Sequence, residues 1–317
     1  MNQQNIFSRV AQLDKIVVRH PALEKARLGI EDCVAKTQFF QEPVGCLLLG
    51  EGGMGKTTVC RSLLATMSES TKVELYTLRT LVPAFYASVP SPATVKSVAA
   101  SLLAKLNDPS PLAGTTAHMT NRLCLLLAAC ETKLVLLDEI HHLFDIRKTS
   151  TLVNVQVCNW IKALVNATKV SLCLVGMPSF APILSIDSQL ARRFPVRFQL
   201  ESLKTGTQDQ PGNLVPFLNE VRHHAMQELG LTTFPRFDQT HNLHQIYAAT
   251  GGSPAFVMSL IKESILEALK TGSSDVTVED FAKAWDAGIT AHANLSHGNP
   301  FRMSAGSLAT ALRAHHG

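Results

Sequence analysis

Residues 50–57 read G-E-G-G-M-G-K-T, a complete phosphate-binding loop of the G-x-x-x-x-G-K-[ST] form. An apolar run at residues 44–49 leads directly into this loop, and a helical pattern follows at residues 56–66. Backbone N–H groups converge on a phosphate only where a strand delivers the glycine turn and a helix begins at its end. The motif therefore restricts this part of the chain to a strand, a tight turn and a helix, and it predicts a nucleotide site.

The residue types in the loop indicate how a nucleotide would be held. The glycines allow the backbone to approach a phosphate closely. Lys56 is expected to reach the β and γ phosphates of ATP, and the hydroxyl of Thr57 is expected to bind Mg²⁺. The loop thus predicts ATP and Mg²⁺ as the cofactors.

A second apolar run, L-V-L-L-D-E at residues 134–139, ends in two carboxylates, as a buried strand that ends at a nucleotide site should. Asp138 is placed to hold Mg²⁺ through water, and Glu139 to polarise the water that attacks the γ-phosphate. Two adjacent acids suit hydrolysis better than transfer to a small molecule. The expected nucleotide-binding residues are Gly50, Glu51, Gly52, Gly53, Met54, Gly55, Lys56, Thr57, Thr58 and Asp138.

Composition favours a protein of the cytoplasm. No apolar stretch approaches the roughly 18 residues that span a bilayer, and residues 1–10 lack a signal-peptide pattern, so we expect no membrane partner. The seven cysteines include no C-x-x-C pair and are expected to be reduced core residues. The net charge of +4 is mild, so any binding of nucleic acid must come from a local surface.

The order of the patterns predicts an α/β fold, a doubly wound parallel five-stranded sheet followed by a small C-terminal helical lid. Strands are expected at residues 44–49, 73–78, 134–137, 171–176 and 196–200, with helices at 92–106, 116–129 and 152–167 between them. Only helical patterns follow, at residues 214–229, 239–249, 255–270 and 278–285. We expect four segments, namely an N-terminal helical extension (1–40), the P-loop ATPase core (41–206), the lid (207–290) and a flexible tail (291–317).

A P-loop sheet followed by a helical lid resembles the AAA+ ATPases, and the finer spelling resembles the TnsC/TniB family of transposition ATPases. Beside the loop, the resemblance rests on L-V-L-L-D-E-I-H-H-L at residues 134–143, L-V-G-M-P at 174–178, Q-L-A-R-R-F at 189–194 and T-G-G-S-P at 250–254. Together these motifs cover most of the chain from residue 44 to residue 285.

The resemblance implies a site that is shared between subunits. In such ATPases an arginine from one subunit completes the nucleotide site of the next, and Arg193 matches the family's E/R-R-F pattern, with Arg192 as the alternative. An arginine in this role meets negative charge that grows in the transition state. The expected catalytic residues are therefore Lys56, Glu139 and Arg193, and a homo-oligomer, ring or filament, is implied.

Two departures from the AAA+ pattern point to slow hydrolysis. Met177 stands where AAA+ proteins usually place a polar sensor after the fourth strand, and only Ser179 is a nearby substitute. In the lid, Ala255 stands where an arginine often follows the glycine-proline turn. Nucleotide is then expected to act mainly as an assembly switch.

The family also lines a central channel with a lysine and a threonine at two helix starts, and Lys96 and Thr115 match them. A lysine and a helix N-terminus would hold the phosphates of any double-stranded DNA sequence. Arg79, Arg122 and His118 could add to this surface.

Three functions remain open from the sequence. The resemblance favours an ATP-dependent regulator of DNA transposition that oligomerises on target DNA, couples a TniQ/TnsD-like target-selection protein to a TnsB-like transposase, and is disassembled by hydrolysis. A replication initiator or helicase loader would have a similar core, but about 30 residues after Trp285 are too few for the winged-helix domain usual there. The third function is a nucleotide-gated DNA-bound scaffold with little hydrolysis.

Overall fold

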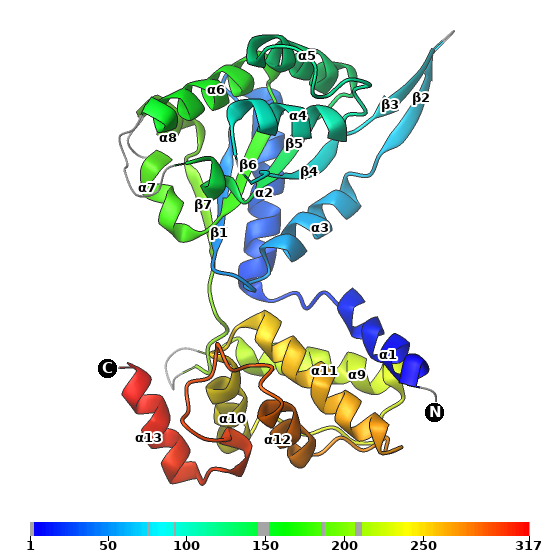
Figure 1. Ribbon diagram of the computed structural model, residues 1–317, viewed down its shortest axis with the longest axis vertical. Coiled ribbons are helices and arrows are strands. Elements are labelled where there is room, and N and C mark those ends of the chain that lie inside the picture. Colours follow the sequence, from blue (N-terminus) through cyan, green and yellow to red (C-terminus); the bar gives the residue numbers. More distant parts are fainter. Residues whose placement is uncertain are drawn as a thin grey trace. The chain divides into compact units, whose positions relative to one another are not determined.

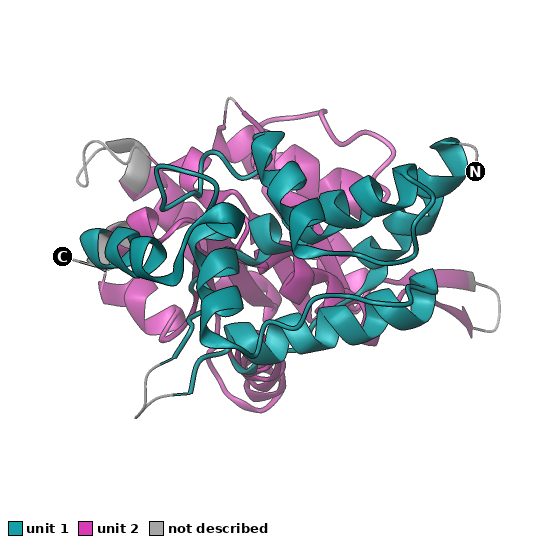
Figure 2. Cartoon of the chain, turned by 90° about the horizontal axis from the view of Figure 1, so that it is seen from below, with its two compact units in different colours: residues 1–21, 201–317 teal, residues 22–200 magenta. Residues whose placement is uncertain are grey.

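The computed structural model describes residues 3–74, 77–91, 93–144, 152–184, 188–206 and 211–316. The chain forms two compact units, one of residues 22–200 and one of residues 1–21 together with 201–317 (Figure 2). Each unit has its own hydrophobic core. None of the described helices is long and apolar enough to cross a membrane.

The 22–200 unit is built on a parallel sheet of five strands in the order β4-β5-β6-β1-β7 (Figure 1). The strands are β1 (Cys46–Gly50), β4 (Ala84–Ser88), β5 (Leu134–Asp138), β6 (Ser171–Gly176) and β7 (Val196–Leu200). All five run in the same direction, so their carboxyl ends share one edge of the sheet. This confirms the predicted doubly wound, five-stranded parallel sheet.

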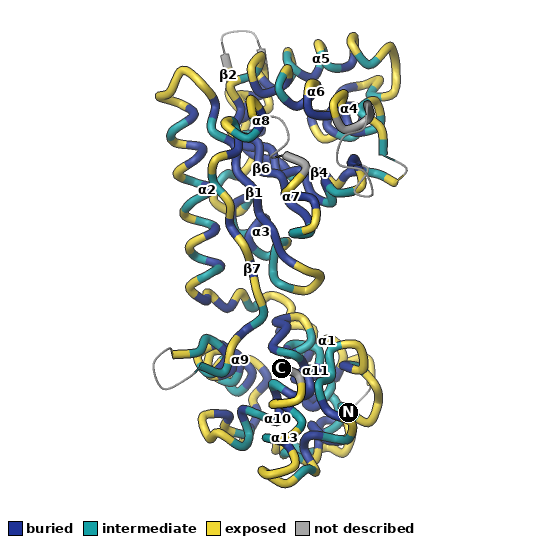
Figure 3. Tube along the Cα trace, turned by 90° about the vertical axis from the view of Figure 1, so that its left-hand side faces the viewer, coloured by how far each residue is buried: buried dark blue, intermediate teal, exposed yellow. Residues whose placement is uncertain are grey.

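Both faces of the sheet are covered by helices. Successive residues of a strand point to opposite faces, and in these strands both sets are mostly apolar, so each face needs a covering layer. Leu47 and Leu49 pack into a core with four helices, whereas Cys46 and Leu48 pack into a second core on the other face. The first face carries α4 (Val95–Lys105), α5 (Thr116–Ala129), α6 (Leu152–Thr168) and α8 (Ser188–Arg193); the second carries α2 (Pro21–Phe39) and α3 (Lys56–Thr66). The strands are accordingly buried along most of their length (Figure 3).

One predicted strand was wrong. The described residues of the predicted strand 73–78 do not enter the sheet. Instead, β2 (Ser70–Glu74) and β3 (Thr77–Leu81) pair antiparallel as a separate ribbon, and the edge strand is β4. The apolar residues of the ribbon alternate with polar and charged ones, and Val73 and Leu78 are 80% and 73% exposed. Such a pattern cannot be buried on both faces, whereas β4, A-F-Y-A-S, can.

The second unit is helical, as the lid prediction required. It contains α1 (Gln3–Val10), η1 (Ala11–Lys15), α9 (Leu214–Leu229), α10 (Thr240–Thr250), α11 (Pro254–Lys270), α12 (Val278–Asp286), η4 (Pro300–Arg302) and α13 (Ala305–His316). The T-G-G-S-P segment turns between α10 and α11. Gly252 has a φ of 70°, and a Cβ there would lie 2.1 Å from the carbonyl oxygen of Leu203, so only glycine fits.

Both chain ends differ from the predicted segments. Residues 1–21 group with residues 201–317, while α2 covers the sheet, so residues 1–40 are not one extension. Residues 291–317 were expected to be a flexible tail, but α13 places Leu308 and Leu312 against Ala248 of α10. This apolar pair, spaced four residues apart on a helix, was obscured by the surrounding His, Ser and Gly residues.

The packing of α2 on the sheet generates a stability prediction. A Cβ added at Gly29 would lie 2.2 and 2.3 Å from ring atoms of the buried Phe198 on β7. We expect Gly29→Ala to destabilise the 22–200 unit by about 1–3 kcal/mol through overpacking, despite a helix-propensity gain of ~1 kcal/mol. Urea denaturation followed by fluorescence of Trp160, in a Trp285→Phe background, measures this effect.

The control is Gly306→Ala in α13, where a Cβ would meet nothing within 4 Å. It should leave the Trp160 transition unchanged. A Gly29→Ala protein as stable as its parent would contradict the close contact between α2 and β7.

Candidate functional site

The predicted phosphate-binding loop connects β1 to α3 at the carboxyl edge of the sheet. Gly53 and Gly55 have φ angles of 78° and 93°, which residues with side chains rarely adopt. Gly55 is the N-cap of α3 and supplies no side-chain hydrogen bond to it. The first N–H groups of α3, from Lys56, Thr57 and Thr58, therefore face the position that a phosphate would take, and the loop fits a nucleotide.

The Lys56 side chain lies across this loop. Its ammonium group donates hydrogen bonds to the carbonyl oxygens of Gly50, at 2.7 Å, and Glu51, at 2.9 Å. These contacts hold the positive charge over the turn between residues 50 and 56. Phosphate oxygens would be stronger acceptors for the same charge, because both partners would then be ionised.

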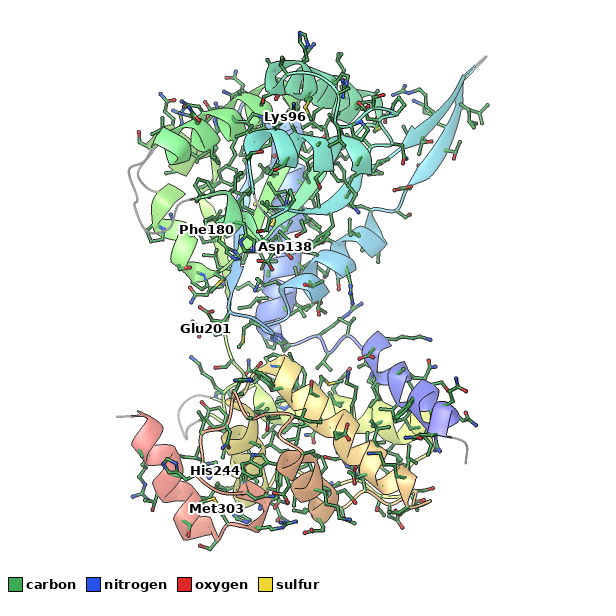
Figure 4. The ribbon with its side chains drawn as sticks, in the orientation of Figure 1. Lys96, Asp138, Phe180, Glu201, His244 and Met303 are labelled. Carbon is green, nitrogen blue, oxygen red and sulfur yellow. The ribbon has the colours of Figure 1, made fainter. Side chains whose placement is uncertain are left out.

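Asp138 is the last residue of β5 and is only 4% exposed (Figure 4). One carboxylate oxygen accepts a hydrogen bond from the Tyr86 hydroxyl at 2.6 Å, and the other accepts one from the backbone N–H of Glu139 at 2.7 Å. Burial first, and the hydrogen bond to Asp138 second, raise the pKa of Tyr86, so its phenol keeps its proton. The carboxylate is thus fixed in orientation at the edge where Mg²⁺ would bind.

Tyr86 was missed by the sequence prediction. It lies on β4, next to β5, and the register that pairs Tyr86 with Leu136 and Ser88 with Asp138 brings its hydroxyl to the carboxylate. The signal was an aromatic residue two positions before a strand end. It could be read only once residues 84–88, rather than 73–78, were known to form the edge strand.

Glu139 adopts a left-handed backbone conformation, with φ 56° and ψ 31°, which is strained for a glutamate. Its carboxylate lies 3.2 Å from Nε2 of His141 and 3.8 Å from Nε2 of His142. Burial is the main cause that lowers the pKa of His141; His142 lowers it further and Glu139 partly opposes this. Possible metal-ligating atoms of Glu139, His141 and His142 all lie within 4.8 Å of one another.

The predicted arginines lie at the opposite edge of the sheet. Both are in the last turn of α8, where the carbonyl oxygen of Arg193 accepts a hydrogen bond from the N–H of Gly45 at 2.7 Å. The Arg193 side chain is 14% exposed and lies 3.5 Å from the Glu42 carboxylate, whereas Arg192 is 66% exposed and lies 3.1 Å from it. The structure therefore does not bring Arg193 to Lys56 and Glu139 of its own chain.

The three residues at the predicted sensor positions follow β6 or begin α11. Met177 directly follows β6, whose Gly176 pairs with Leu49 of β1, so its backbone lies near the start of the loop; a methionine side chain offers no polar sensor group there. Ser179 is exposed. Ala255 occupies the first turn of α11 in the other unit.

The predicted DNA-binding residues are exposed at helix starts. Lys96 lies in the first turn of α4, apart from Asp138 in Figure 4, and Thr115 is the N-cap of α5, where its hydroxyl accepts a hydrogen bond from the N–H of His118. The C-terminal ends of the two helices meet at one small pocket, which is lined by Leu106 and Asn107, directly after α4, and by Ala129, the last residue of α5. Their starts therefore both point away from that shared end.

The additional basic residues have structural partners. Arg122 donates to the Asp108 carboxylate at 2.8 Å and to the carbonyl oxygens of Ser110 and Ala113, which holds the connection between α4 and α5. Arg79 lies 3.7 Å from the Glu131 carboxylate and also donates to the carbonyl of Ala129. Both arginines are thus held by partners of their own chain, and a role for them in DNA binding remains a prediction.

Comparisons with known proteins agree with this geometry. The family model for the bacterial TniB protein matches residues 11–204. No curated protein matches the chain.

Several solved structures share the fold. Cdc6p from Pyrobaculum aerophilum has a TM-score of 0.56 and 15% identity, covering 85% of this chain and 68% of that chain. The Aeropyrum pernix ORC1 protein in complex with DNA has a TM-score of 0.57 and 17% identity, covering 86% and 66%. The ADP form of Aeropyrum pernix ORC2 has a TM-score of 0.56 and 12% identity, covering 86% and 69%. The chain thus spans about two thirds of the length of these proteins, and the fold is that of an AAA+ P-loop ATPase, as predicted.

The roles of Lys56 and Glu139 can be separated by substitution. Lys56→Ala should abolish nucleotide binding, because the charge that neutralises the phosphates is lost. Glu139→Gln should keep binding but lower turnover by roughly 10²-fold or more, because an amide cannot accept the proton of the attacking water. Binding is measured with a fluorescent ATP analogue and turnover by phosphate release.

Glu131→Gln is the matched control, since Glu131 is also a glutamate at positive φ, 51°, but contacts surface groups. It should bind and hydrolyse ATP as the parent does. Hydrolysis at the parental rate by Glu139→Gln would show that another group activates the water.

Proposed function

The chain belongs to the TniB family, and from this we propose that it is an ATP-dependent regulator of DNA transposition. It oligomerises on target duplex DNA, couples a TniQ/TnsD-like target-selection protein to a TnsB-like transposase, and is disassembled by ATP hydrolysis. The observation that carries the proposal is the position of Arg193, the arginine predicted to complete a nucleotide site. It lies at the amino edge of the sheet, opposite the phosphate-binding loop of its own chain.

That separation favours a site completed in trans. The five residues of β1, at ~3.3 Å each, place Gly45 and the neighbouring Arg193 about 16 Å from the start of the phosphate-binding loop. An arginine side chain is too short to cross the sheet. A second subunit that presents its amino edge to the carboxyl edge of the first would supply Arg193, and repetition of this head-to-tail contact gives a ring or a filament.

Each residue of the site then has one role. Bound ATP·Mg²⁺ supplies the phosphoanhydride and the counter-charge. Lys56 would neutralise the charge of the β and γ phosphates, and Thr57 and the fixed Asp138 carboxylate are the residues that would hold Mg²⁺. Glu139 orients and deprotonates water once it leaves the histidines, and Arg193 of the next subunit leaves Glu42 to meet charge in the transition state.

Two observations favour the second candidate, a nucleotide-gated scaffold with little hydrolysis. Glu139 is held by His141 at 3.2 Å, and Met177 offers no polar group beside the loop. Turnover measured on assembled protein separates the candidates: release of phosphate that depends on Glu139 supports the regulator, and its absence supports the scaffold. The likeness to Cdc6p, ORC1 and ORC2, at 12–17% identity, concerns the fold alone.

The proposal that Arg193 completes the nucleotide site of a neighbouring subunit is tested by mixing variants. Arg193→Ala should bind ATP but fail to assemble on DNA with ATP, or hydrolyse only at background rate, because an arginine in trans contributes roughly 10³ to 10⁵ in rate. Mixed with Lys56→Ala protein, it should regain part of the activity, since one chain supplies the arginine and the other the intact loop. Phosphate release across a series of mixing ratios measures the rescue.

Arg192→Ala, tested in the same way, decides between the two arginines. If both variants are folded and co-assemble yet no mixture is rescued, neither arginine acts in trans. Rescue with Arg192→Ala alone would assign the role to Arg192.

The DNA surface is tested by salt dependence. Lys96→Ala should weaken duplex binding equally on unrelated sequences and reduce the salt slope by roughly 0.9 per lost contact, because a lysine on a phosphate releases a counterion. Thr115→Ala should have a smaller effect, since its hydroxyl is uncharged. Fluorescence anisotropy at several salt concentrations, with ATP present, measures both.

Lys283→Ala, which removes a half-exposed lysine of α12, is the control and should change neither affinity nor slope. An unchanged slope for Lys96→Ala would place the duplex elsewhere on the protein.

A further inference from the structure

Two adjacent phenylalanines are exposed at the end of α2. Phe39 is 88% exposed, the largest fraction among the large hydrophobic residues of the described chain, and Phe40 is 54% exposed. The segment that carries them, residues 37–44, is closed by Thr37, whose hydroxyl accepts a hydrogen bond from the N–H of Val44 at 2.9 Å. The two rings are therefore presented to solvent by a short and closed loop.

This 37–44 loop lies directly beside Arg193. Glu42, within the loop, is the carboxylate that contacts both Arg192 and Arg193, and Gly45, just after it, bonds to the backbone of Arg193. A neighbouring subunit that contacts Arg193 at the amino edge of the sheet would therefore also contact Phe39 and Phe40.

A pocket of about 600 Å³ lies near the nucleotide site, between α3 and β4. Its apolar walls include Leu64, Met67 and Ala84. At one end it is bounded by Thr57, a predicted Mg²⁺ ligand, and by Tyr86, whose hydroxyl holds Asp138. The pocket thus borders the place where the γ-phosphate and Mg²⁺ would lie.

We propose that Phe39 and Phe40 of one subunit insert into this α3/β4 pocket of the next subunit. The inference rests on the proposed head-to-tail assembly and names the contact that holds it. Each phenylalanine can bury about 150–250 Å² of surface, and the pocket is large enough for such rings. One docking event then brings Arg193 to the neighbouring nucleotide and the aromatic rings to the apolar pocket beside it.

The charges around the two surfaces are complementary. Glu42 beside the phenylalanines can face Arg61 and Lys105, which line the pocket, while the exposed Arg192 can face Glu69. Exchange of Glu42 to these partners would free Arg193. The loop precedes β1, whereas the pocket lies along β4, and β5 and β6 stand between these two strands in the sheet. A chain therefore cannot fill its own pocket, and the occupant is a second copy.

The contact also explains how nucleotide could control assembly. Tyr86 forms part of the pocket wall, and its hydroxyl donates a hydrogen bond to the Asp138 carboxylate. A movement of the Asp138 carboxylate on binding Mg²⁺ would therefore shift Tyr86 and change the wall of the pocket that receives the phenylalanines. The interface would form best when ATP·Mg²⁺ is bound.

Photocrosslinking tests the contact directly. With p-benzoyl-phenylalanine in place of Phe39, irradiation in the presence of ATP and duplex DNA should join two chains, with crosslinks at Met67 or Leu64 by mass spectrometry. The same probe in place of Leu78, which is 73% exposed on β3, should not label the pocket. Adding Lys56→Ala should abolish the Phe39 crosslink, because ATP no longer binds.

Complementation provides a second measurement. Phe39→Ala/Phe40→Ala and Leu64→Arg should each bind ATP but raise the concentration needed for assembly by about tenfold or more. Mixed together, the two variants should form dimers but no larger oligomers. Each pair retains one intact loop and one intact pocket, which together allow a single interface. Sedimentation velocity separates these species.

The outcomes distinguish this inference from the proposed function. Parental protein that assembles with ATP and DNA, but crosslinks from position 39 to any surface other than the α3/β4 pocket, overturns the contact and leaves the proposed function standing. Normal assembly by both variants does the same. Parental protein that never assembles with ATP and DNA overturns both.

Discussion

The five parallel strands of the 22–200 unit bury side chains on both faces, and this constraint decides where polar chemistry can lie. The central strands β1, β5 and β6 are buried along their whole length and cannot carry ionised side chains in their middle, so such groups gather where these strands end. The carboxyl edge holds Lys56, Asp138 and Glu139, and the amino edge holds the arginines of α8. A two-sided core thus places the residues that we propose for catalysis at opposite ends of the same unit.

At the carboxyl edge, the two neighbouring acids are held in different ways. Both oxygens of Asp138 have protein donors, and it lies almost completely buried. Glu139 has a strained backbone and a half-exposed side chain that rests on two imidazoles. The Asp138 carboxylate is therefore fixed in one orientation, whereas the Glu139 carboxylate can be released, which would suit the roles that we propose for them.

The sequence predicted those features that depend on local backbone chemistry. The loop, Asp138 and Glu139 follow from glycine turns and a short buried strand, and the helices of residues 214–286 follow from their apolar period. It could not predict β4 or the Tyr86 contact, because these depend on which of two short segments pairs with β5. It also missed the grouping of residues 1–21 with residues 201–317, since contacts between distant segments leave no local pattern. The roles of Arg193, Lys96 and Thr115 remain predictions.

The grouping of the first 21 residues with the C-terminal helices has a consequence for synthesis on the ribosome. Ile6, Val10 and Leu13 lie in the same core as α9 and α11, which are made only after the entire sheet. At ~5–20 residues per second, the nascent chain carries these side chains without their partners for roughly ten to forty seconds. The 22–200 unit can fold in that interval. Helix α1 is therefore synthesised before the sheet but can pack into its own core only after the sheet is complete.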